Sequence, residues 1–124
     1  LPDRTKEQVM EEMRAAVADS GDPWLADNFE IDFTYRHDAN VIEPDHPMVL
    51  ALQESLRAIG KPGDVSAMTA SCDAWVYNNR LGIPTVVFGG GSLGVAHSEQ
   101  EQMPVQDMLD AGAALTGFVE RFCV

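Results

Sequence analysis

The feature that most constrains this chain is a run of β-branched and aromatic residues that enters a glycine-rich turn. Val86, Val87 and Phe88 form an apolar run that is typical of a buried strand. The glycines at positions 89–91 then allow a backbone turn that side chains would forbid. Because open α/β sheets bind ligands at the carboxyl ends of their strands, we expect His97 to lie where a neutral imidazole can bind a metal.

Residues 1–40 predict one helix and one strand. Thr5 and Gln8 have the spacing of a capping box, and apolar residues recur at helical spacing until residues 20–23 end the helix. Apolar and polar residues alternate over 29–36, which predicts a strand with one buried face. We expect the apolar face of this strand to pack on the apolar face of the helix. The residues expected to meet are Phe29, Ile31, Phe33 and Tyr35 of the strand and Val9, Met13 and Val17 of the helix.

From residue 43 onward, the pattern alternates between helices and short buried strands. Asp45 can cap a helix whose first turn suits Pro47 and which Gly60 ends. The elements predicted after it are a strand at 65–69, a short helix at 72–80, a strand at 85–88 and a final helix that Pro104 opens. We expect the final helix to pack on the strand around Val86. This alternation predicts an α/β fold.

The change of pattern near Asn40 predicts a domain boundary between residues 38 and 46. Residues before it contain an amphipathic strand, whereas the strands predicted after it are buried on both faces. The sequence therefore predicts two structural zones, a helix with a strand and then an α/β region.

The composition narrows the classes of partner and location. The net charge of −12 argues against nucleic acid and against anionic membrane surfaces, since both are bound through Lys and Arg. Cys72 and Cys123 lack the spacing of a disulfide scaffold or a zinc ribbon and are typical of reduced thiols. With no long apolar run and no cationic signal segment, we expect a cytoplasmic protein. Because Leu1 is not an initiator methionine, we expect a fragment or a processed product.

The glycine turn and its histidine resemble the end of the catalytic domain in a family of di-zinc amidohydrolases. That family includes acetylornithine deacetylase, succinyl-diaminopimelate desuccinylase, aminoacylase and carboxypeptidase G, and it typically reads G-I-P-x-V-x-F-G-P-G-S-L, a few residues, then A-H-x-x-N-E. The matching residues are Gly82-Ile83-Pro84, Phe88-Gly89, Gly91-Ser92-Leu93, Ala96-His97 and Glu101. The sequence departs from the family at Gly90, where Pro is usual, and at Gln100, where Asn is usual.

Shorter matches extend the resemblance over most of the chain. Asp22-Pro23-Trp24-Leu25 resembles the family's D-P-W-L segment, and Asp45-His46-Pro47 resembles its D-H-P segment. The family's T-x-x-S-D-A segment resembles Thr69-Ala70-Ser71-Cys72-Asp73-Ala74. The resemblance implies that residues 1–40 are the last helix and strand of an inserted α+β lid (dimerisation) domain. It implies that residues 41–124 are the C-terminal portion of a zinc-peptidase-like catalytic α/β domain, in an enzyme that forms a homodimer through the lid.

The resemblance also implies a set of site residues. His97 would bind one of the two zinc ions of the complete enzyme, and Glu101 would be an outer partner that fixes the imidazole tautomer. The residues implied to bind the substrate are Gly89, Gly91, Ser92 and Asp73. The bridging Asp and the catalytic Glu of the family lie upstream, so no catalytic residue is expected in this chain.

Each of these roles has a structural alternative. His97 can be a hydrogen-bonded turn histidine, the glycine turn can be a plain turn before a helix, and Asp73 can cap the short helix. Of the other histidines, His37 is expected to be a solvated residue at the end of the amphipathic strand, and His46 is expected to have a structural role at a helix start.

Two hypotheses of function from different classes follow. The first is the C-terminal part of a zinc-dependent deacylase that removes the acyl group of an N-acyl amino acid, with N-acetylornithine or a close relative as the favoured substrate. The second is a non-catalytic acidic binding or dimerisation module that keeps the fold. Residues 1–124 alone are expected to be inactive, because one imidazole and one nearby carboxylate cannot supply four ligands.

Overall fold

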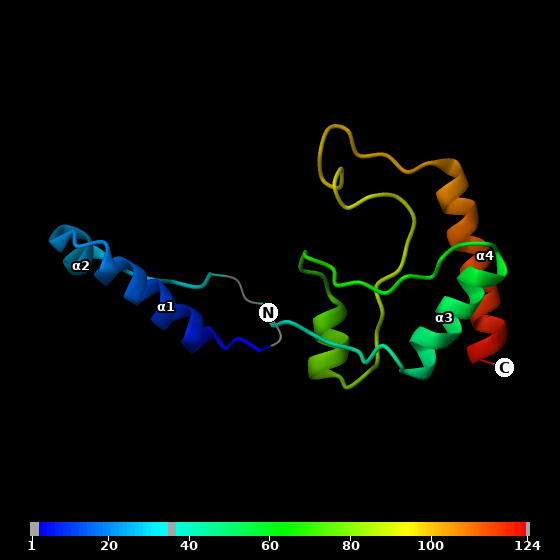
Figure 1. Ribbon diagram of the computed structural model, residues 1–124, viewed down its shortest axis with the longest axis horizontal. Coiled ribbons are helices and arrows are strands. Elements are labelled where there is room, and N and C mark those ends of the chain that lie inside the picture. The colour runs from blue at the N-terminus through cyan, green and yellow to red at the C-terminus, as the bar shows by residue number, and fades with distance from the viewer. Residues whose placement is uncertain (1–2, 35–36, 124) are drawn as a thin grey trace. The chain divides into compact units, whose positions relative to one another are not determined.

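A computed structural model describes residues 3–34 and 37–123 of the chain (Figure 1). The helices in these residues are α1 (Lys6–Asp19), α2 (Pro23–Asn28), α3 (Pro47–Ala58), the π-helix η1 (Val76–Arg80) and α4 (Val105–Phe122). The chain divides into two compact units, residues 1–41 and 42–124. The division falls inside the interval 38–46 where the sequence places a boundary, whereas the assignment of the units to a lid and a catalytic domain stays a prediction.

The first unit begins with the predicted capping box. The backbone N–H of Thr5 donates to Oε1 of Gln8 at 2.8 Å, and the N–H of Gln8 donates to Oγ1 of Thr5 at 3.2 Å. Helix α2 was not predicted, although Asp22 and Pro23 carry a readable start signal. The Asp22 carboxylate accepts from the N–H of Trp24 at 2.9 Å, and Pro23 occupies the first turn. Ser20 caps the end of α1, and Asp22 and Pro23 begin α2 two residues later.

The predicted strand over 29–36 is wrong, since none of its described residues belongs to a strand. The alternation of its side chains is nevertheless visible, because Ile31 and Phe33 are half-buried while Asp32 is exposed. The ammonium of Lys6, in the first turn of α1, lies 5.0 Å from the centroid of the Phe33 ring. The expected burial against α1 does not occur, since α1 buries no residue and Met13 is exposed. Tyr35 lies outside the described residues.

In the second unit, α3 begins and ends close to the predicted residues. Its N-cap is His46 and not Asp45, and Nδ1 of His46 accepts from the N–H of Met48 at 3.2 Å. The structural role expected of His46 is thus confirmed. Gly60 ends the helix at φ 78°, and the N–H of Lys61 donates to the carbonyl of Leu56 at 2.9 Å. This is the Schellman pattern that favours glycine after a helix.

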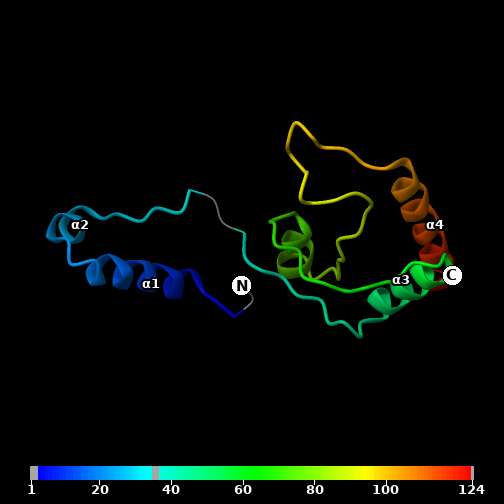
Figure 2. The ribbon, with the colours of Figure 1, turned by 45° about the horizontal axis from the view of Figure 1, so that its top comes forward.

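The final helix α4 packs on α3, so the predicted packing on a strand around Val86 is wrong (Figures 1 and 2). Ala114 of α4 is fully buried, and Val49 and Ser55 of α3 are only 3% and 1% exposed. The Ser55 hydroxyl donates to the carbonyl of Ala51 at 2.8 Å, which satisfies a polar group inside this contact. A second small cluster of buried residues, Ala74 and Trp75, lies just before η1.

The predicted α/β fold is contradicted, because residues 3–34 and 37–123 contain helices and no β-strand. The backbone around Thr85 gives the reason for one missing strand. Its carbonyl accepts from Nδ2 of Asn78 at 3.0 Å and its N–H donates to Oδ1 of Asn78 at 2.9 Å, so a side-chain amide takes both of its hydrogen bonds. Pro84 has no N–H to donate. Extended backbone without a neighbouring strand is not a sheet.

Across the described ranges, the helices lack the combination of length and apolar character that a bilayer crossing requires.

Candidate functional site

The glycine turn lies against the beginning of α4. Gly91 has φ 84°, a left-handed conformation that glycine adopts without steric cost. A Cβ added to Gly90 would lie 2.9 Å from the carbonyl oxygen of Asp107 and 3.0 Å from Sδ of Met103. Such contacts are too short, so the close approach of the turn to α4 requires glycine at position 90. The family's usual proline would not fit this arrangement without a shift of the helix start.

Three of the residues expected to bind the substrate belong to this turn or follow it directly. Gly89, Gly91 and Ser92 are all exposed. The Ser92 hydroxyl already accepts from the N–H of Gly94 at 3.2 Å, which is the local hydrogen bond of a serine turn. The geometry thus supports the structural alternative for Ser92, while substrate binding by the turn stays a prediction.

His97 is exposed and has φ 60°, the one non-glycine residue with positive φ in the described ranges. L-residues adopt this conformation at a cost, so the surrounding structure has to hold it. Its backbone N–H donates to Oε2 of Glu101 at 2.9 Å. His97 is therefore a turn histidine whose imidazole projects from a strained backbone, and this arrangement is compatible with either of the roles considered for it.

Glu101 contacts His97 differently from the way the resemblance implies. The expected contact was with the imidazole, where a carboxylate would fix the tautomer. The observed contact is with the backbone N–H, so Glu101 stabilises the conformation of the peptide that carries the imidazole. The role of Glu101 toward the ring stays a prediction.

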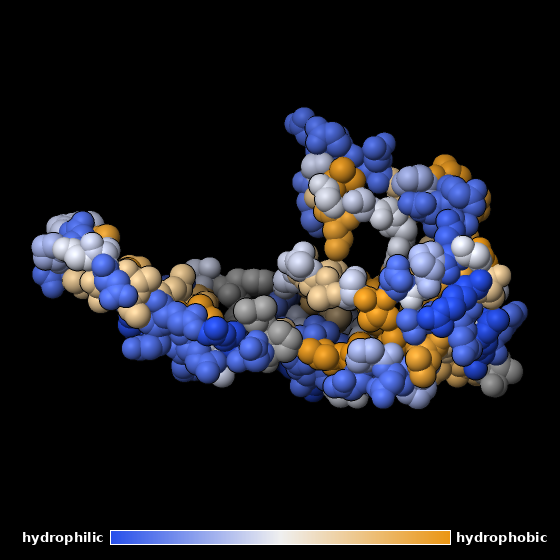
Figure 3. Space-filling model, viewed as in Figure 1, coloured by the Kyte–Doolittle hydropathy of each residue, from blue (hydrophilic) through white to orange (hydrophobic). Residues whose placement is uncertain are grey.

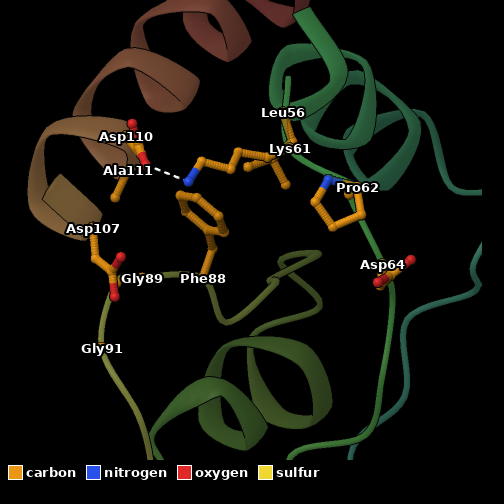
Figure 4. Close-up of a pocket in the computed structure, with 12 residues that line it drawn as sticks. Leu56, Lys61, Pro62, Asp64, Phe88, Gly89, Gly91, Asp107, Asp110 and Ala111 are labelled. Carbon is orange, nitrogen blue, oxygen red and sulfur yellow. Dashed lines mark ion pairs between the residues drawn. The ribbon is translucent and has the colours of Figure 1, made fainter. Parts of the chain in front are cut away.

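A cavity of about 250 Å³ lies between the glycine turn, the loop after α3 and the first turns of α4 (Figure 4). Its apolar part includes the ring of Phe88 and the side chains of Leu56 and Pro62. The remaining lining residues are Lys61, Gly63, Asp64, Gly89, Gly90, Gly91, Asp107, Asp110 and Ala111. His97 and Asp73 do not line it, so the structure does not bring all of the predicted site residues together.

An ion pair closes one side of this cavity. Nζ of Lys61 lies 2.6 Å from Oδ2 of Asp110, and the two side chains are 43% and 22% exposed (Figure 4). The hydrogen bond from Lys61, together with one from Nε2 of Gln106 at 2.9 Å, lowers the pKa of Asp110. The hydrogen bond and the charge of Asp110 raise the pKa of Lys61. Both groups are thus held in their charged forms.

Sequence reasoning missed this pair, and it also missed the role of Asn78. Lys61 and Asp110 lie far apart along the chain, and no local pattern connects them. Asn78 could have been noticed as a polar residue on a short helix next to an apolar run, since Asn side chains readily bond to backbone.

Asp73 does not line the cavity and takes part in a local turn. The backbone carbonyl of Asp73 accepts from the N–H groups of Val76 and Tyr77 at 2.9 and 3.4 Å, so Asp73 starts the turn that leads into η1. Its side chain is exposed, and no side-chain cap is formed at the Trp75 N-cap position of η1. His37, which was expected to be a solvated residue, is half-buried.

The described residues do not form a metal centre by themselves. Within 3–34 and 37–123, no group of three or more His, Cys, Asp and Glu side chains is arranged to hold a metal ion. A tetrahedral zinc site needs three or four such donors, and the surroundings of His97 supply at most one imidazole and one carboxylate. A metal site that used His97 would require donors from outside residues 1–124.

Comparison with curated proteins finds two relatives. The N-formyl-4-amino-5-aminomethyl-2-methylpyrimidine deformylase of Bacillus subtilis is 26% identical over 137 aligned positions, which cover 98% of this chain and 32% of the relative. An uncharacterized metallohydrolase of Methanocaldococcus jannaschii is 31% identical over 59 residues, which cover 48% of this chain and 17% of the relative. The chain thus spans about a third of the length of the first relative. No solved structure gives a significant match.

The family of the chain follows from a match that covers nearly all of it. Residues 4–121 match the model of Peptidase family M20/M25/M40. This range contains the glycine turn and His97, and it covers most of each unit. The chain therefore belongs to Peptidase family M20/M25/M40.

Proposed function

We propose that the complete protein hydrolyses the amide bond of a small N-acylated compound. The observation that carries this proposal is the family match over residues 4–121. It is supported by the two relatives, one of which is named as a deformylase and the other as a metallohydrolase. Because the chain spans about a third of the first relative, the activity is proposed for the protein that contains it.

Two kinds of substrate fit this proposal. The resemblance of the glycine turn favours an N-acyl amino acid such as N-acetylornithine. The deformylase favours an N-formylated aminomethylpyrimidine, because it matches 98% of this chain. Both compounds are amides of a small primary amine and differ in the acyl group and in the body of the molecule. A direct comparison of the two is therefore part of the test.

The proposed roles of individual residues follow from the same resemblance. His97 is proposed as a ligand to a zinc ion whose other donors lie outside residues 1–124. Glu101 is proposed as the group that holds His97 in position. When bound, such an ion polarises a carbonyl and lowers the pKa of water. Gly89, Gly91 and Ser92 are proposed to contact the substrate through backbone N–H groups and a hydroxyl. Asp73 is proposed near the same pocket.

The second candidate is a non-catalytic acidic module that binds or dimerises through this fold. The net charge of −12 favours it, as does the lack of a donor cluster among the described residues. Dimerisation through residues 1–40 is compatible with both candidates. The two candidates differ in a single respect that can be measured, which is turnover of an amide.

The test is metal analysis and hydrolysis by the protein from the complete gene. The metal content is measured by mass spectrometry, and release of amine is measured for N-acetylornithine, other N-acyl amino acids and the N-formylated aminomethylpyrimidine. We expect bound metal and turnover of at least one compound. Turnover should be lost after chelation and regained when zinc is added. A folded complete protein without metal and without turnover on the whole panel would favour the acidic module.

A further inference from the structure

The side chain of Asn78 holds the backbone of the segment that leads into the glycine turn. Oδ1 of Asn78 accepts from the N–H of Thr85 at 2.9 Å, and Nδ2 of Asn78 donates to the carbonyl of Thr85 at 3.0 Å. An amide side chain offers a donor and an acceptor in one plane, so it can bind both backbone groups of a single residue. Two such bonds fix the position of Thr85 and also the rotation of its backbone, since each bond has a preferred direction.

Asn78 is itself held on a fixed element. It lies in η1, directly after the buried Trp75, and the guanidinium of Arg80 lies 4.8 Å from the centroid of the Trp75 ring. The N–H of Ile83 donates to the carbonyl of Tyr77 at 2.8 Å, which attaches the same segment to η1 at a second point. π-Helices are rare and are frequently found at functional sites. The contact with Thr85 thus transmits the position of η1 to the segment before the turn.

The glycine turn lies in a segment that depends on such contacts. Residues 81–103, all of which the structure describes, contain no buried residue. Figure 3 shows mainly hydrophilic residues at the top of the second unit, where Figure 1 places the loop between the glycine turn and α4. After the turn, the carboxylate of Glu101 accepts from the N–H of His97. A side chain therefore holds the backbone on each side of the turn, Asn78 before it and Glu101 after it.

We propose that Asn78 is a positioning residue for substrate binding, because it fixes the path of residues 85–91. This role rests on the proposed function, in which Gly89 and Gly91 contact the substrate through their N–H groups. Thr85 lies four residues before Gly89, so at most about 14 Å of extended chain separates the fixed peptide from the turn. A rotation of the Thr85 backbone is thus carried over to the N–H groups that meet the substrate. Asn78 acts through the turn and does not itself contact the substrate.

The test uses two variants of Asn78 in the protein from the complete gene. Asn78→Asp keeps the size of the side chain, removes the donor and places a carboxylate oxygen opposite the carbonyl of Thr85. Asn78→Leu removes both hydrogen bonds and adds no charge. The compound that the parent hydrolyses is the substrate. In both variants KM should rise about tenfold while kcat stays within about threefold of the parent, because contacts made equally in the ground state and the transition state are lost. The metal content should not change.

The control is His46→Ala, which removes a hydrogen bond to the backbone at the start of α3 and should leave KM unchanged. A purely structural role of Asn78 would lower stability but leave KM unchanged, since the folded molecules would still bind the substrate normally. An unchanged KM in both variants would therefore overturn the proposal. A higher KM in Asn78→Asp alone would overturn it in favour of the added charge. Loss of metal from either variant would overturn it as well, because the proposed target is the turn.

Hydrogen exchange measured by mass spectrometry tests the contact without turnover. In Asn78→Leu the amides of residues 86–94 should exchange at least about fivefold faster than in the parent, and those of α3 and α4 should change by less than about twofold. Equal exchange over 86–94 would overturn the proposal even if KM changed. A parent that hydrolyses nothing on the panel would overturn the proposed function and the role in substrate binding together, whereas the exchange result would still decide whether Asn78 fixes the turn.

Discussion

The packed helices α3 and α4 and the irregular segment 81–103 are stabilised in different ways. The helices pack on each other and contain the buried residues Val49, Ser55 and Ala114, and α3 has caps at both ends. The segment, which carries the glycine turn and His97, is held by hydrogen bonds between side chains and backbone. Asn78 pairs in this way with the backbone of Thr85, and the carboxylate of Glu101 accepts from the N–H of His97. Each such bond contributes about 1 kcal/mol, so we expect the segment to open more easily than the helices. All of the predicted site residues except Asp73 therefore lie in a segment that contains no buried residue.

The largest effect on function, with little effect on stability, is expected from His97→Ala in the complete protein. An exposed side chain contributes little packing, so the fold should survive, with a free energy of unfolding within about 0.5 kcal/mol of the parent. If the imidazole binds metal, turnover should fall by more than about 100-fold, since loss of an outer partner alone costs up to that much. The metal content should fall together with turnover. Zinc content and turnover are measured together on each variant.

The matched controls are His37→Ala and His46→Ala, which should keep metal and turnover. His46→Ala should lower stability by about 1 kcal/mol, because it removes the N-cap of α3. Retention of metal and of near-normal turnover by His97→Ala would rule out the proposed ligand.

Glu101→Ala should have the next largest effect. Its carboxylate holds the backbone N–H of His97, so its loss should loosen the imidazole and reduce turnover by about 10–100-fold. Glu101→Gln keeps an acceptor oxygen and should lose less. If the two variants are equally impaired, the negative charge matters and the hydrogen bond to the backbone does not explain the role of Glu101.

These two regions also differ in how far the sequence predicted them. The capping box of Thr5 and Gln8, the start of α3 at Pro47 and its end at Gly60 were all predicted, because each depends on residues within a few positions. The cap at His46 was assigned one residue too early, to Asp45. These boundaries were predicted correctly because the residues that begin and end a helix lie within a few positions of the boundary itself.

The strands were predicted wrongly because a strand depends on a neighbour that sequence periodicity does not identify. Val86 and Val87 have the composition of a buried strand, yet the amide of Asn78 takes the backbone bonds of Thr85. The final helix was predicted correctly, but its packing partner was not, since α4 packs on α3. Among the candidate site residues, His97 and the glycine turn were found from local pattern, whereas the contact between Lys61 and Asp110 joins residues that no local pattern connects.

Overpacking the contact between α3 and α4 tests its share of the stability. Ala114→Leu places three extra carbons at a fully buried position and should lower the free energy of unfolding by about 1–3 kcal/mol. Ala113→Leu adds the same atoms at an exposed position and should change it by less than about 0.5 kcal/mol. Both are measured by denaturant unfolding. Equal effects would show that Ala114 does not lie at a tight contact.

A smaller effect is expected from the strained backbone of His97. Glycine adopts φ 60° without steric cost, so His97→Gly should be more stable than His97→Ala by up to about 1 kcal/mol, although both remove the imidazole. Comparison of their unfolding curves isolates the backbone contribution, since both variants lack the same side chain. A lower stability of the glycine variant would mean that position 97 does not hold a left-handed conformation in solution.

The smallest effect is expected from the ion pair of Lys61 and Asp110, and its pH dependence has a definite sign. The pKa of Asp110 lies below its ordinary value of 3.8, so its contribution to stability is present above that value and is lost as the pH falls through the folded pKa. The pKa of Lys61 lies above its ordinary value of 10.5, so its contribution is present below that value and is lost as the pH rises through the folded pKa.

Asp110→Asn should therefore lower stability near neutral pH, and its stability should converge with that of the parent at both extremes of pH. Because both side chains are partly exposed, salt should reduce the difference. Denaturant unfolding of the two proteins over the pH range measures it, and a difference that stays constant with pH would show that the pair does not form.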